Sequence, residues 1–557
     1  MKEQAAGAPA GEGGAGRPAG PGATAEFVSL PRRQVLLTMG GLMLALFLAA
    51  LDQTVVGTAM PRIVGDLGGF DKFTWITSAY IVASTTVVPI VGRLSDLYGR
   101  KLFYILAIVI FLVTSVLAGF SQTMNQLIFF RALQGIGGGA IMALAFVSIG
   151  DLFPPAERGK YQGIISAVFG LSSVIGPTLG GFITDNISWH WVFFINLPLG
   201  IPIVALFVKY FPSSHISARK APLDIPGVVL LILSIVPVML GLSMGGVQYE
   251  WSSPIVIGLV AISAVAVVLF IIVESRAKDP IMPLGIYKNP VVSLSLLIMF
   301  CVGFGMFGGI VFVPLYFQGV LGASATSSGS FLTPMMLGVV FGAALSGQAL
   351  SRFGGRYRLQ GLVGLSIMAT GIFLLSRMTP DTSYGLAVLN IILMGFGMGT
   401  TFPTFTIAVQ NAVPHSFLGV ATSATQFYRS IGGSLGLAIL GAYMTNRFTA
   451  HLADTLSPAV REAVPAEQIS EIAGNPQAMV GGNALAALQE RFAGAGPQGA
   501  ELAQQMLTGL RLGLSHAISD VFTVSLATVV VGLFLTYFIK EVPLRGRGPV
   551  SGGHAEI

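Results

Sequence analysis

The segment "GRLSDLYGRKLFYILAIVIFLVTSVLAGF" (92–120) joins a short charged stretch to a long apolar one. Residues 92–101 hold two glycines and charges of both signs, whereas residues 103–120 hold no charge at all. About 20 consecutive apolar residues suffice for an α-helix to cross the hydrocarbon core of a bilayer. The segment therefore predicts a transmembrane helix that begins directly after a charged loop.

The rest of the chain repeats this contrast. Of its 557 residues, 53% are hydrophobic and only 10% are charged, whereas a soluble protein has about 25% charged residues. The apolar runs are continuous and do not alternate with polar residues, which excludes a transmembrane β-barrel and leaves helices as the spanning element. The sequence predicts an all-α integral membrane protein.

Fourteen apolar runs, separated by charged and turn residues, predict fourteen transmembrane helices. Their approximate ranges are 35–58, 74–93, 102–120, 124–149, 161–184, 191–210, 225–244, 254–273, 291–316, 328–350, 360–376, 385–410, 420–444 and 516–539. An even number of spans places both termini on one side, and the loops and tails of that side hold 21 of the 30 Lys and Arg residues. Because positive loops face the cytoplasm, we expect a multi-pass protein of the cell membrane with both termini cytoplasmic.

Glycine-rich signatures recur at a nearly constant spacing. "QGIGGGA" (134–140) matches "MGFGMGT" (394–400) at an offset of 260 residues, and three more glycine pairs keep that offset. The charged stretch recurs as "GQALSRFGGR" (347–356), with Ser351 where Asp96 stands. The pattern predicts two homologous six-helix halves, an arrangement typical of transporters that work by alternating access.

The repeat predicts how the chain is divided. The divisions are a disordered cytoplasmic tail at 1–33, an N-terminal six-helix half at 34–211, two inserted helices with flanking loops at 212–289, a C-terminal six-helix half at 290–540 that includes an external loop at 445–515, and a cytoplasmic tail at 541–557. Within the external loop, "NALAALQERF" (483–492) and "AELAQQMLTGLRLGL" (500–514) have the periodicity of short amphipathic helices.

Four motifs resemble those of the fourteen-span drug:proton antiporter family of the major facilitator superfamily, and the resemblance extends over residues 35–540. "GRLSDLYGRK" (92–101) is similar to the superfamily signature between spans 2 and 3. The others are "LDQTVVGTAMPRI" (51–63) in span 1, "RALQGIGGG" (131–139) in span 4 and "GLSSVIGPTLGG" (170–181) in span 5, the last being similar to a motif that marks exporters. The resemblance implies the major facilitator fold with 14 transmembrane helices and a multidrug efflux function.

Three charged residues inside the predicted spans are candidates for proton coupling. Asp52 lies about midway along span 1, where an ionised carboxylate is costly and marks an ion pathway. Burial favours the protonated carboxyl and a nearby cation favours the ionised one, so Asp52 is the candidate proton carrier. Arg131 and Arg429 stay protonated and are its candidate partners; the resemblance implies a role in proton transfer for Arg131. The alternatives are a permanently paired structural acid and arginines that only bridge helices or reach an interface.

The charged stretch is predicted to be a conformational gate formed by Gly92, Asp96, Gly99 and Arg100. The glycines permit a tight turn between helices. Asp96 has two potential partners, namely Arg100 one turn later and the N-terminus of a helix in the other half. Either contact would hold the cytoplasmic side closed in the outward-facing state.

The span 5 motif contains Gly170, Gly176, Pro177, Gly180 and Gly181. Gly176 and Gly180 are four residues apart and share one face of the helix, which predicts close packing on a neighbouring helix. Pro177 cannot donate a backbone hydrogen bond and is expected to bend the helix. We expect a tightly packed, bendable contact and not a ligand site.

Aromatic and methionine residues near mid-membrane predict an adaptable apolar substrate pocket. The candidates are Met299, Phe304, Phe307, Phe402, Phe405 and Phe427, and packing inside the helices or against lipid is the alternative for each.

No Asp or Glu occurs between Asp279 and Asp381 or between Asp381 and Asp454. Spans 9 to 13 therefore lack the acids with which some members of the resembled family bind cationic drugs.

Enzyme and cofactor motifs are missing from the sequence. There is no phosphate-binding G-x-x-x-x-G-K-[ST] motif, and the six histidines have no metal-ligand spacing. We therefore expect no enzyme activity, no metal, no cofactor and no nucleic-acid partner.

The predicted function is export of hydrophobic, often cationic, small molecules in exchange for protons by a monomer in the lipid bilayer. A dedicated exporter of one natural product or lipid, and a transporter-like receptor or scaffold, are the alternatives.

Overall fold

The computed structural model describes residues 31–68, 72–212, 223–246, 248–322, 325–352, 355–463 and 496–544. Across these ranges the chain is helical, and the β pairing is limited to one isolated bridge between Gly245 and Tyr249. The prediction of an all-α protein is confirmed. Most of the two predicted tails lies outside the described residues.

The helices follow one another with short connections. Their bounds are α1 (Arg32–Leu67), α2 (Phe73–Tyr98), α3 (Arg100–Gly119), α4 (Met124–Leu152), α5 (Pro155–Asn186), α6 (Trp191–Phe194), α7 (Asn196–Tyr210), α8 (Ile225–Met244), α9 (Pro254–Arg276), α10 (Pro290–Gly319), α11 (Ala325–Arg352), α12 (Tyr357–Leu375), α13 (Tyr384–Ala412), α14 (Leu418–Thr455), α15 (Pro458–Ala463) and α18 (Gly496–Tyr537), with 3₁₀ turns at Leu284–Lys288 and His415–Phe417. Counting α6 and α7 as one, 13 of the described helices are long and apolar enough to cross a membrane. The more polar α14 has comparable length and completes the predicted set of about fourteen.

Local signals explain where several helices begin. Side-chain oxygens of Thr123, Asp224, Ser253 and Asn289 accept hydrogen bonds from backbone N–H groups in the first turns of α4, α8, α9 and α10, as N-cap residues do. Gly99 separates α2 from α3 with a φ of 95°, which a residue with a side chain rarely adopts. The predicted tight turn between these helices is therefore present.

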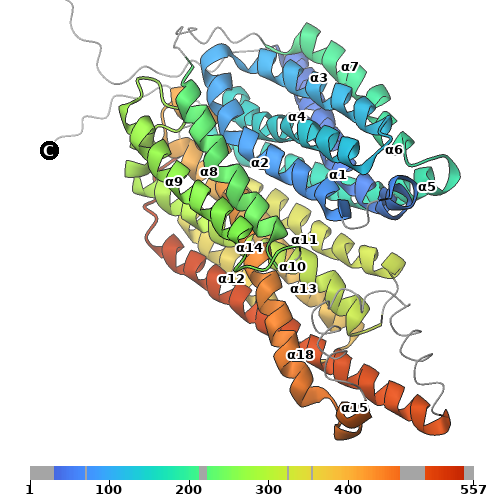
Figure 1. Cartoon of the computed structure of the whole chain (residues 1–557). Coiled ribbons are helices and arrows are strands. Elements are labelled where there is room, and N and C mark those ends of the chain that lie inside the picture. The colour runs from blue at the N-terminus through green and yellow to red at the C-terminus, as the bar shows by residue number, and fades with distance from the viewer. Residues whose placement is uncertain are drawn as a thin grey trace, which may run out of the picture.

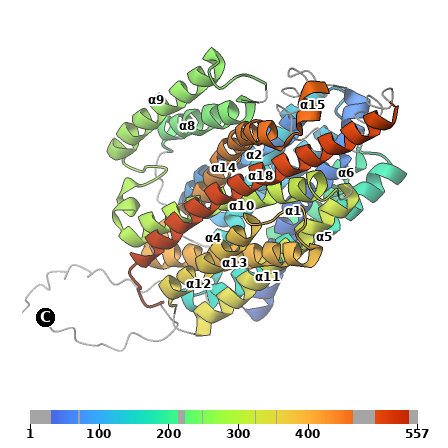
Figure 2. The ribbon, with the colours of Figure 1, turned by 90° about the horizontal axis from the view of Figure 1, so that it is seen from below.

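Two bundles of helices lie side by side in Figure 1. Helices α1 to α7 pack against one another, and α10 to α18 form the second bundle. The hairpin of α8 and α9 lies at one edge of the molecule in Figure 2, where α8 contacts α2 and α14. Most side chains of α9 are exposed although they are apolar, as expected of a helix that faces lipid.

Glycines make the closest helix contacts in the two bundles in equivalent ways. A Cβ on Gly135 or Gly139 of α4 would overlap the backbone of α2, and a Cβ on Gly395 or Gly399 of α13 would overlap the backbone of α11. These glycines are related by the offset of 260 residues. The sequence repeat therefore corresponds to a repeat of helix contacts, in which small residues let backbones approach closely.

Two further glycine contacts join one bundle to the other. Gly92 of α2 faces Gly419 of α14, and Gly159 of α5 faces Gly347 of α11; at each position a Cβ would overlap backbone of the opposite bundle. We call these contacts the α2–α14 seam and the α5–α11 seam. Both lie where α2 and α11 end and where α5 and α14 begin, so the bundles touch at the end that carries the predicted cytoplasmic loops.

Helices extend from both sides into the predicted external loop at 445–515. Helix α14 continues to Thr455, the short α15 follows, and α18 begins at Gly496; residues 464–495, which include "NALAALQERF", lie outside the described residues. Residues 500–514 are the first turns of α18 and not a separate short helix. The predicted spans end where polar residues begin. Helices α14 and α18 continue further because apolar residues such as Leu452, Met506 and Leu510 are buried between the two helices.

The predicted span 191–210 is present as one candidate membrane span, with a local interruption of the helix at Ile195. Helix α6 ends at Phe194 and α7 begins at Asn196. Pro198 has no N–H to donate to the carbonyl of Phe194 four residues earlier, which accounts for the interruption. At this point the carbonyl of Phe193 accepts a hydrogen bond from the Ser115 hydroxyl of α3 at 2.9 Å.

Candidate functional site

Asp52 of α1 is buried, with 1% of its surface exposed, and it accepts hydrogen bonds from two other helices. Its Oδ2 accepts from Nη1 of Arg131 in α4 at 2.6 Å. Its Oδ1 accepts from Nε2 of Gln134 in α4 at 3.0 Å and from Nδ2 of Asn196 in α7 at 2.9 Å. We call these four residues the Asp52 cluster, in which both carboxylate oxygens accept hydrogen bonds.

Arg131 is held from several directions. Its Nη1 also donates to Oε1 of Gln134 at 2.8 Å, and its Cζ lies 4.4 Å from the ring centroid of Tyr80 in α2, a cation–π geometry. Removing one partner of a buried ion pair costs about 3–5 kcal/mol. The pair of Asp52 and Arg131 therefore stabilises the packing of α1 on α4 in addition to placing two charges in the interior.

The sequence analysis did not identify Gln134, Asn196 or Tyr80. Gln134 follows Arg131 by one helical turn, and Asn196 is the only polar residue between Trp191 and Lys209, so both left a signal in the sequence. Asn196 lies in the first turn of α7, and its Nδ2 also donates to Oγ of Ser115 at 2.9 Å. Its Oδ1 is buried and accepts no hydrogen bond from the described residues.

Arg429 does not pair with Asp52. It lies on α14, where a guanidinium nitrogen donates to Oε1 of Gln426 and the Cζ lies 4.5 Å from the ring centroid of Phe402 in α13. The structure therefore answers which arginine meets the buried carboxylate: it is Arg131. A direct contact of Arg429 with Asp52, considered from the sequence, is absent in this conformation.

Asp96, in the predicted gate, makes both of the contacts that were considered for it. One carboxylate oxygen accepts from Arg100 Nη2. The two oxygens also accept from the backbone N–H groups of Gly419 and Val420, at 3.1 and 3.0 Å, at the N-terminus of α14. Asp96 thus connects the end of α2 to the opposite bundle, at a helix end that favours negative charge.

Neighbouring residues strengthen the α2–α14 seam. Arg100 Nε donates to Oδ2 of Asp151 at 2.8 Å. Gly92 is required because a Cβ there would overlap the Ser423 side chain and the Gly419 carbonyl. All of these groups except Asp151 are buried, so water does not compete for the hydrogen bonds of Asp96.

The span 5 motif packs α5 against α1 beside the Asp52 cluster. A Cβ on Gly176 would overlap Thr54, and a Cβ on Gly180 would overlap Thr58 and lie 2.8 Å from the carbonyl oxygen of Val55. The expected close approach of the two helices is therefore present.

The remaining residues of this motif differ in their surroundings. Gly170 faces Val340 of α11 in the opposite bundle, whereas a Cβ on Gly181 would meet no atom within 4 Å. Pro177 lies inside α5 on its exposed side. Only part of the motif is therefore a packing contact.

The predicted substrate residues fall into two groups. Met299, Phe304, Phe405 and Phe427 are at most 8% exposed and belong to apolar clusters inside the protein; in this conformation they are core residues. Phe307 and Phe402 are partly exposed. Of these two, Phe402 is the one that contacts a charged side chain, Arg429.

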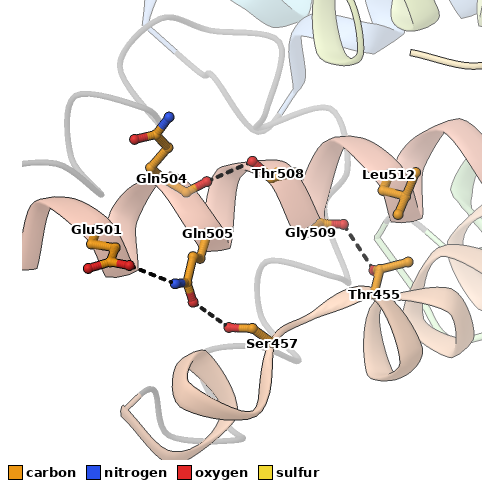
Figure 3. Close-up of a pocket in the computed structure, with 8 residues that line it drawn as sticks. All are labelled: Thr455, Ser457, Glu501, Gln504, Gln505, Thr508, Gly509 and Leu512. Carbon is orange, nitrogen blue, oxygen red and sulfur yellow. Dashed lines mark hydrogen bonds between the residues drawn. The ribbon is translucent and has the colours of Figure 1, made fainter. Parts of the chain in front are cut away.

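A pocket of about 480 Å³ lies apart from the Asp52 cluster, where α14 and α15 meet the first turns of α18. Figure 3 shows its polar lining: the Ser457 hydroxyl donates to Oε1 of Gln505 at 2.8 Å, and the Thr455 hydroxyl donates to the Gly509 carbonyl at 2.9 Å. These hydrogen bonds join the polar extensions of α14 and α18. No predicted site residue lines this pocket.

Known membrane transporters are similar to this chain over most of its length. The family profile described as Major Facilitator Superfamily matches residues 42–437. "Multidrug transporter protein MdtP" of Bacillus subtilis (strain 168) is 41% identical over 518 residues, which are 93% of this chain and 94% of that protein. "Multidrug resistance protein 3" of the same strain is 45% identical over 419 residues, 75% of this chain and 81% of that protein. The crystal structure of the human organic anion transporter MFSD10 (TETRAN) has a TM-score of 0.56 at 13% identity, with 90% of this chain and all of that chain covered.

Proposed function

The chain belongs to the Major Facilitator Superfamily, and we propose that it exports hydrophobic small molecules across the cytoplasmic membrane in exchange for protons. As a member of this family it is a multi-pass membrane transporter and not an enzyme. Two relatives that are 41% and 45% identical are named as a multidrug transporter and a multidrug resistance protein. Their names support drugs as the substrates.

The observation that carries proton coupling is the Asp52 cluster. Within the described residues, Arg131 is the one cation that pairs with this buried carboxylate. Because an arginine remains protonated, the carboxylate is the group of the pair that can take up a proton. Protonation of Asp52 removes its negative charge, weakens its attraction to Arg131, and so links the position of α1 relative to α4 to proton binding.

Alternating access is supported by the contacts between the bundles. The α2–α14 and α5–α11 seams close the end that carries the predicted cytoplasmic loops, as expected of an outward-facing state. Opening that end requires the backbone hydrogen bonds of Asp96 to break and the glycine contacts to separate. We propose that a proton enters Asp52 from outside and that the substrate enters after the seams open to the cytoplasm.

Replacing Asp52 with asparagine tests this proposal. In energised inverted membrane vesicles, Asp52→Asn is expected to abolish proton-driven accumulation of ethidium, because the amide cannot carry a proton. Energy-independent exchange of labelled ethidium across the membrane should persist and show that the variant is folded. The matched control is Asp66→Asn on the same helix, since Asp66 accepts a hydrogen bond from Trp189 at 2.8 Å and lies outside the cluster.

The outcomes also separate the alternative functions. Uphill ethidium transport by Asp52→Asn at the wild-type rate would contradict proton coupling through this residue. Transport of a single compound out of a broad panel of drugs and lipids would identify a dedicated exporter. Lack of any protonophore-sensitive transport by the wild-type protein would favour a receptor or scaffold.

A further inference from the structure

Arg429 is a cation in the interior of the second bundle. A Cβ on Gly303 of α10 would overlap the carbonyl of Arg429, so the backbone of α14 is held tightly against α10 at this point. The side chain lies over the ring of Phe402 in α13 and remains partly exposed. Its position is therefore fixed by three helices, and its charge is not fully enclosed by protein.

This cation has no acidic partner. Among the described residues, no carboxylate lies within 4.0 Å of Arg429, and its hydrogen-bond acceptor is the neutral amide of Gln426. The sequence from 382 to 453 contains no Asp or Glu, and neither does that from 280 to 380. Helices α10 to α13 therefore offer no side chain that could neutralise Arg429.

The interior acid is already engaged elsewhere. Asp52 pairs with Arg131 and accepts from Gln134 and Asn196, so that pair has no net charge. Arg429 then leaves one uncompensated positive charge among the interior residues of α1, α4 and α14. Charged groups inside membrane helices are expensive and pair with one another or face a substrate pathway.

We propose that Arg429, Gln426 and Phe402 form a subsite for the anionic group of a hydrophobic substrate, such as an aromatic carboxylate. The guanidinium matches the two oxygens of a carboxylate with parallel N–H donors. The ring of Phe402 provides an apolar surface for an adjoining aromatic ring. The resemblance to drug antiporters implied substrates that are often cationic, but the charge of this interior favours the opposite sign. The proposal rests on the export function proposed above.

Binding of three probes with one ring system tests the subsite without requiring transport. The probes are 2-naphthoate, 2-naphthamide and 2-naphthylmethylammonium, which carry a negative, zero and positive charge. Titrated into the full-length protein in lipid nanodiscs, with empty nanodiscs as the blank, naphthoate should bind about tenfold more tightly than naphthamide, as one charge-assisted contact provides. The ammonium compound should bind most weakly.

Variants of Arg429 assign this preference to the side chain. Arg429→Gln should make naphthoate and naphthamide bind equally, and Arg429→Lys should retain part of the preference because it keeps the charge but loses the paired donors. Arg447→Gln is the matched control on the same helix, because Arg447 is already neutralised by Asp520 at 2.5 Å. It should leave the preference unchanged.

Specific results would overturn the proposal. Equal binding of the three probes, tighter binding of the ammonium compound, or an acid preference that survives Arg429→Gln would each exclude the anion subsite. Proton-driven export without any acid preference would remove the subsite and leave the export function. An acid preference lost in Arg429→Gln, in a protein that shows no proton-driven export, would support the subsite and remove the export function.

Discussion

Asn196 of α7 connects the buried acid to two further helices. Its amide reaches Oδ1 of Asp52 in α1 and Oγ of Ser115 in α3 at the same time. Its own Oδ1 is buried without a donor among the described residues. A carboxamide that rotates by half a turn would present this oxygen to a protonated Asp52, so Asn196 is suited to both charge states of the acid.

The exchange Asn196→Leu keeps the volume and removes both functions of the amide. We expect the rate of proton-driven dye efflux to fall about tenfold, since a hydrogen bond to a charged acceptor is worth about 1.5–3 kcal/mol. Initial rates of dye efflux measure the change. Ser115→Ala, which touches the acid only through Asn196, should lower the rate less; an unchanged rate in Asn196→Leu would show that the amide does not support proton coupling.

For single residues, the sequence could predict which charged side chains lie inside the membrane-spanning helices. An acid and an arginine inside apolar spans stand out in the sequence, and Asp52 and Arg131 do meet. The sequence left open which arginine is the partner, because helical periodicity places a residue on a face and does not say which helix that face meets. The roles of both residues and of Arg429 in transport remain predictions.

Helix α5 lies so close to α1 that Gly176 and Gly180 have no room for a side chain. Thr54 and Thr58 occupy the space that a Cβ on Gly176 or Gly180 would need, and Thr54 also donates to the Ser172 carbonyl at 3.2 Å. Asp52 lies directly before this contact on α1. The packing of α5 therefore helps to fix the position of the candidate proton carrier.

Two adjacent glycines provide a matched test of this packing. Gly180→Ala should lower stability by about 1–3 kcal/mol, the usual penalty for overfilling a packed contact, and so lower the melting temperature of the purified protein. Gly181→Ala places the same methyl group in open space and should leave melting unchanged. Equal melting temperatures for the two variants would argue against a packed contact at Gly180.

Helix boundaries could be predicted where an apolar run ends at charged residues. The predictions were wrong where a helix continues beyond its apolar run by packing against another helix and not against lipid. Helices α14 and α18 continue past the predicted spans, since Leu452 and Met506 are buried between their polar extensions. This error arises from contacts between helices distant in sequence.

For the whole molecule, the two seams differ at the position of Asp96. In the α2–α14 seam, Asp96 accepts from Gly419 and Val420 across the bundles. In the α5–α11 seam the equivalent residue, Ser351, donates to the Gly347 carbonyl of its own helix. Opening the first seam therefore requires the loss of hydrogen bonds to a buried carboxylate, whereas the second is held by packing alone at this position.

The variant Asp96→Asn should shift the population toward a state open at this end, because an amide presents its N–H₂ group to donors that require an acceptor. The reporter is the cysteine introduced by Gln162→Cys in a Cys301→Ser background, since Gln162 is buried on α5. Its labelling by a permeant maleimide should accelerate about tenfold, equivalent to the loss of roughly 1.4 kcal/mol. Ser351→Ala should not change the rate, and an equal rate in Asp96→Asn would exclude a gating role.

The fold class and the repeat could be predicted because hydrophobic length and glycine spacing are properties of the sequence itself. The conformational state could not, because the same residues must serve both the closed and the open arrangement. The exact pairing of Gly92 with Gly419, for example, depends on how the bundles are rotated, which no local pattern encodes. The predicted division into tails, halves and inserted helices likewise remains a prediction.

In each seam, a glycine of one half meets a glycine of the other half, and the two seams use the same two equivalent positions with the halves exchanged. Gly347 stands where the first half has Gly92, and Gly419 stands where it has Gly159, so both seams are one contact made in opposite directions. Such reciprocity defines an isologous interface, in which residue i of one subunit meets residue j of its twin and the reverse. A six-helix protein with this pattern already carries both sides of a two-fold homodimer contact. The present chain has the architecture of that dimer, with its halves joined through α8 and α9 and with Ser351 at the position equivalent to Asp96.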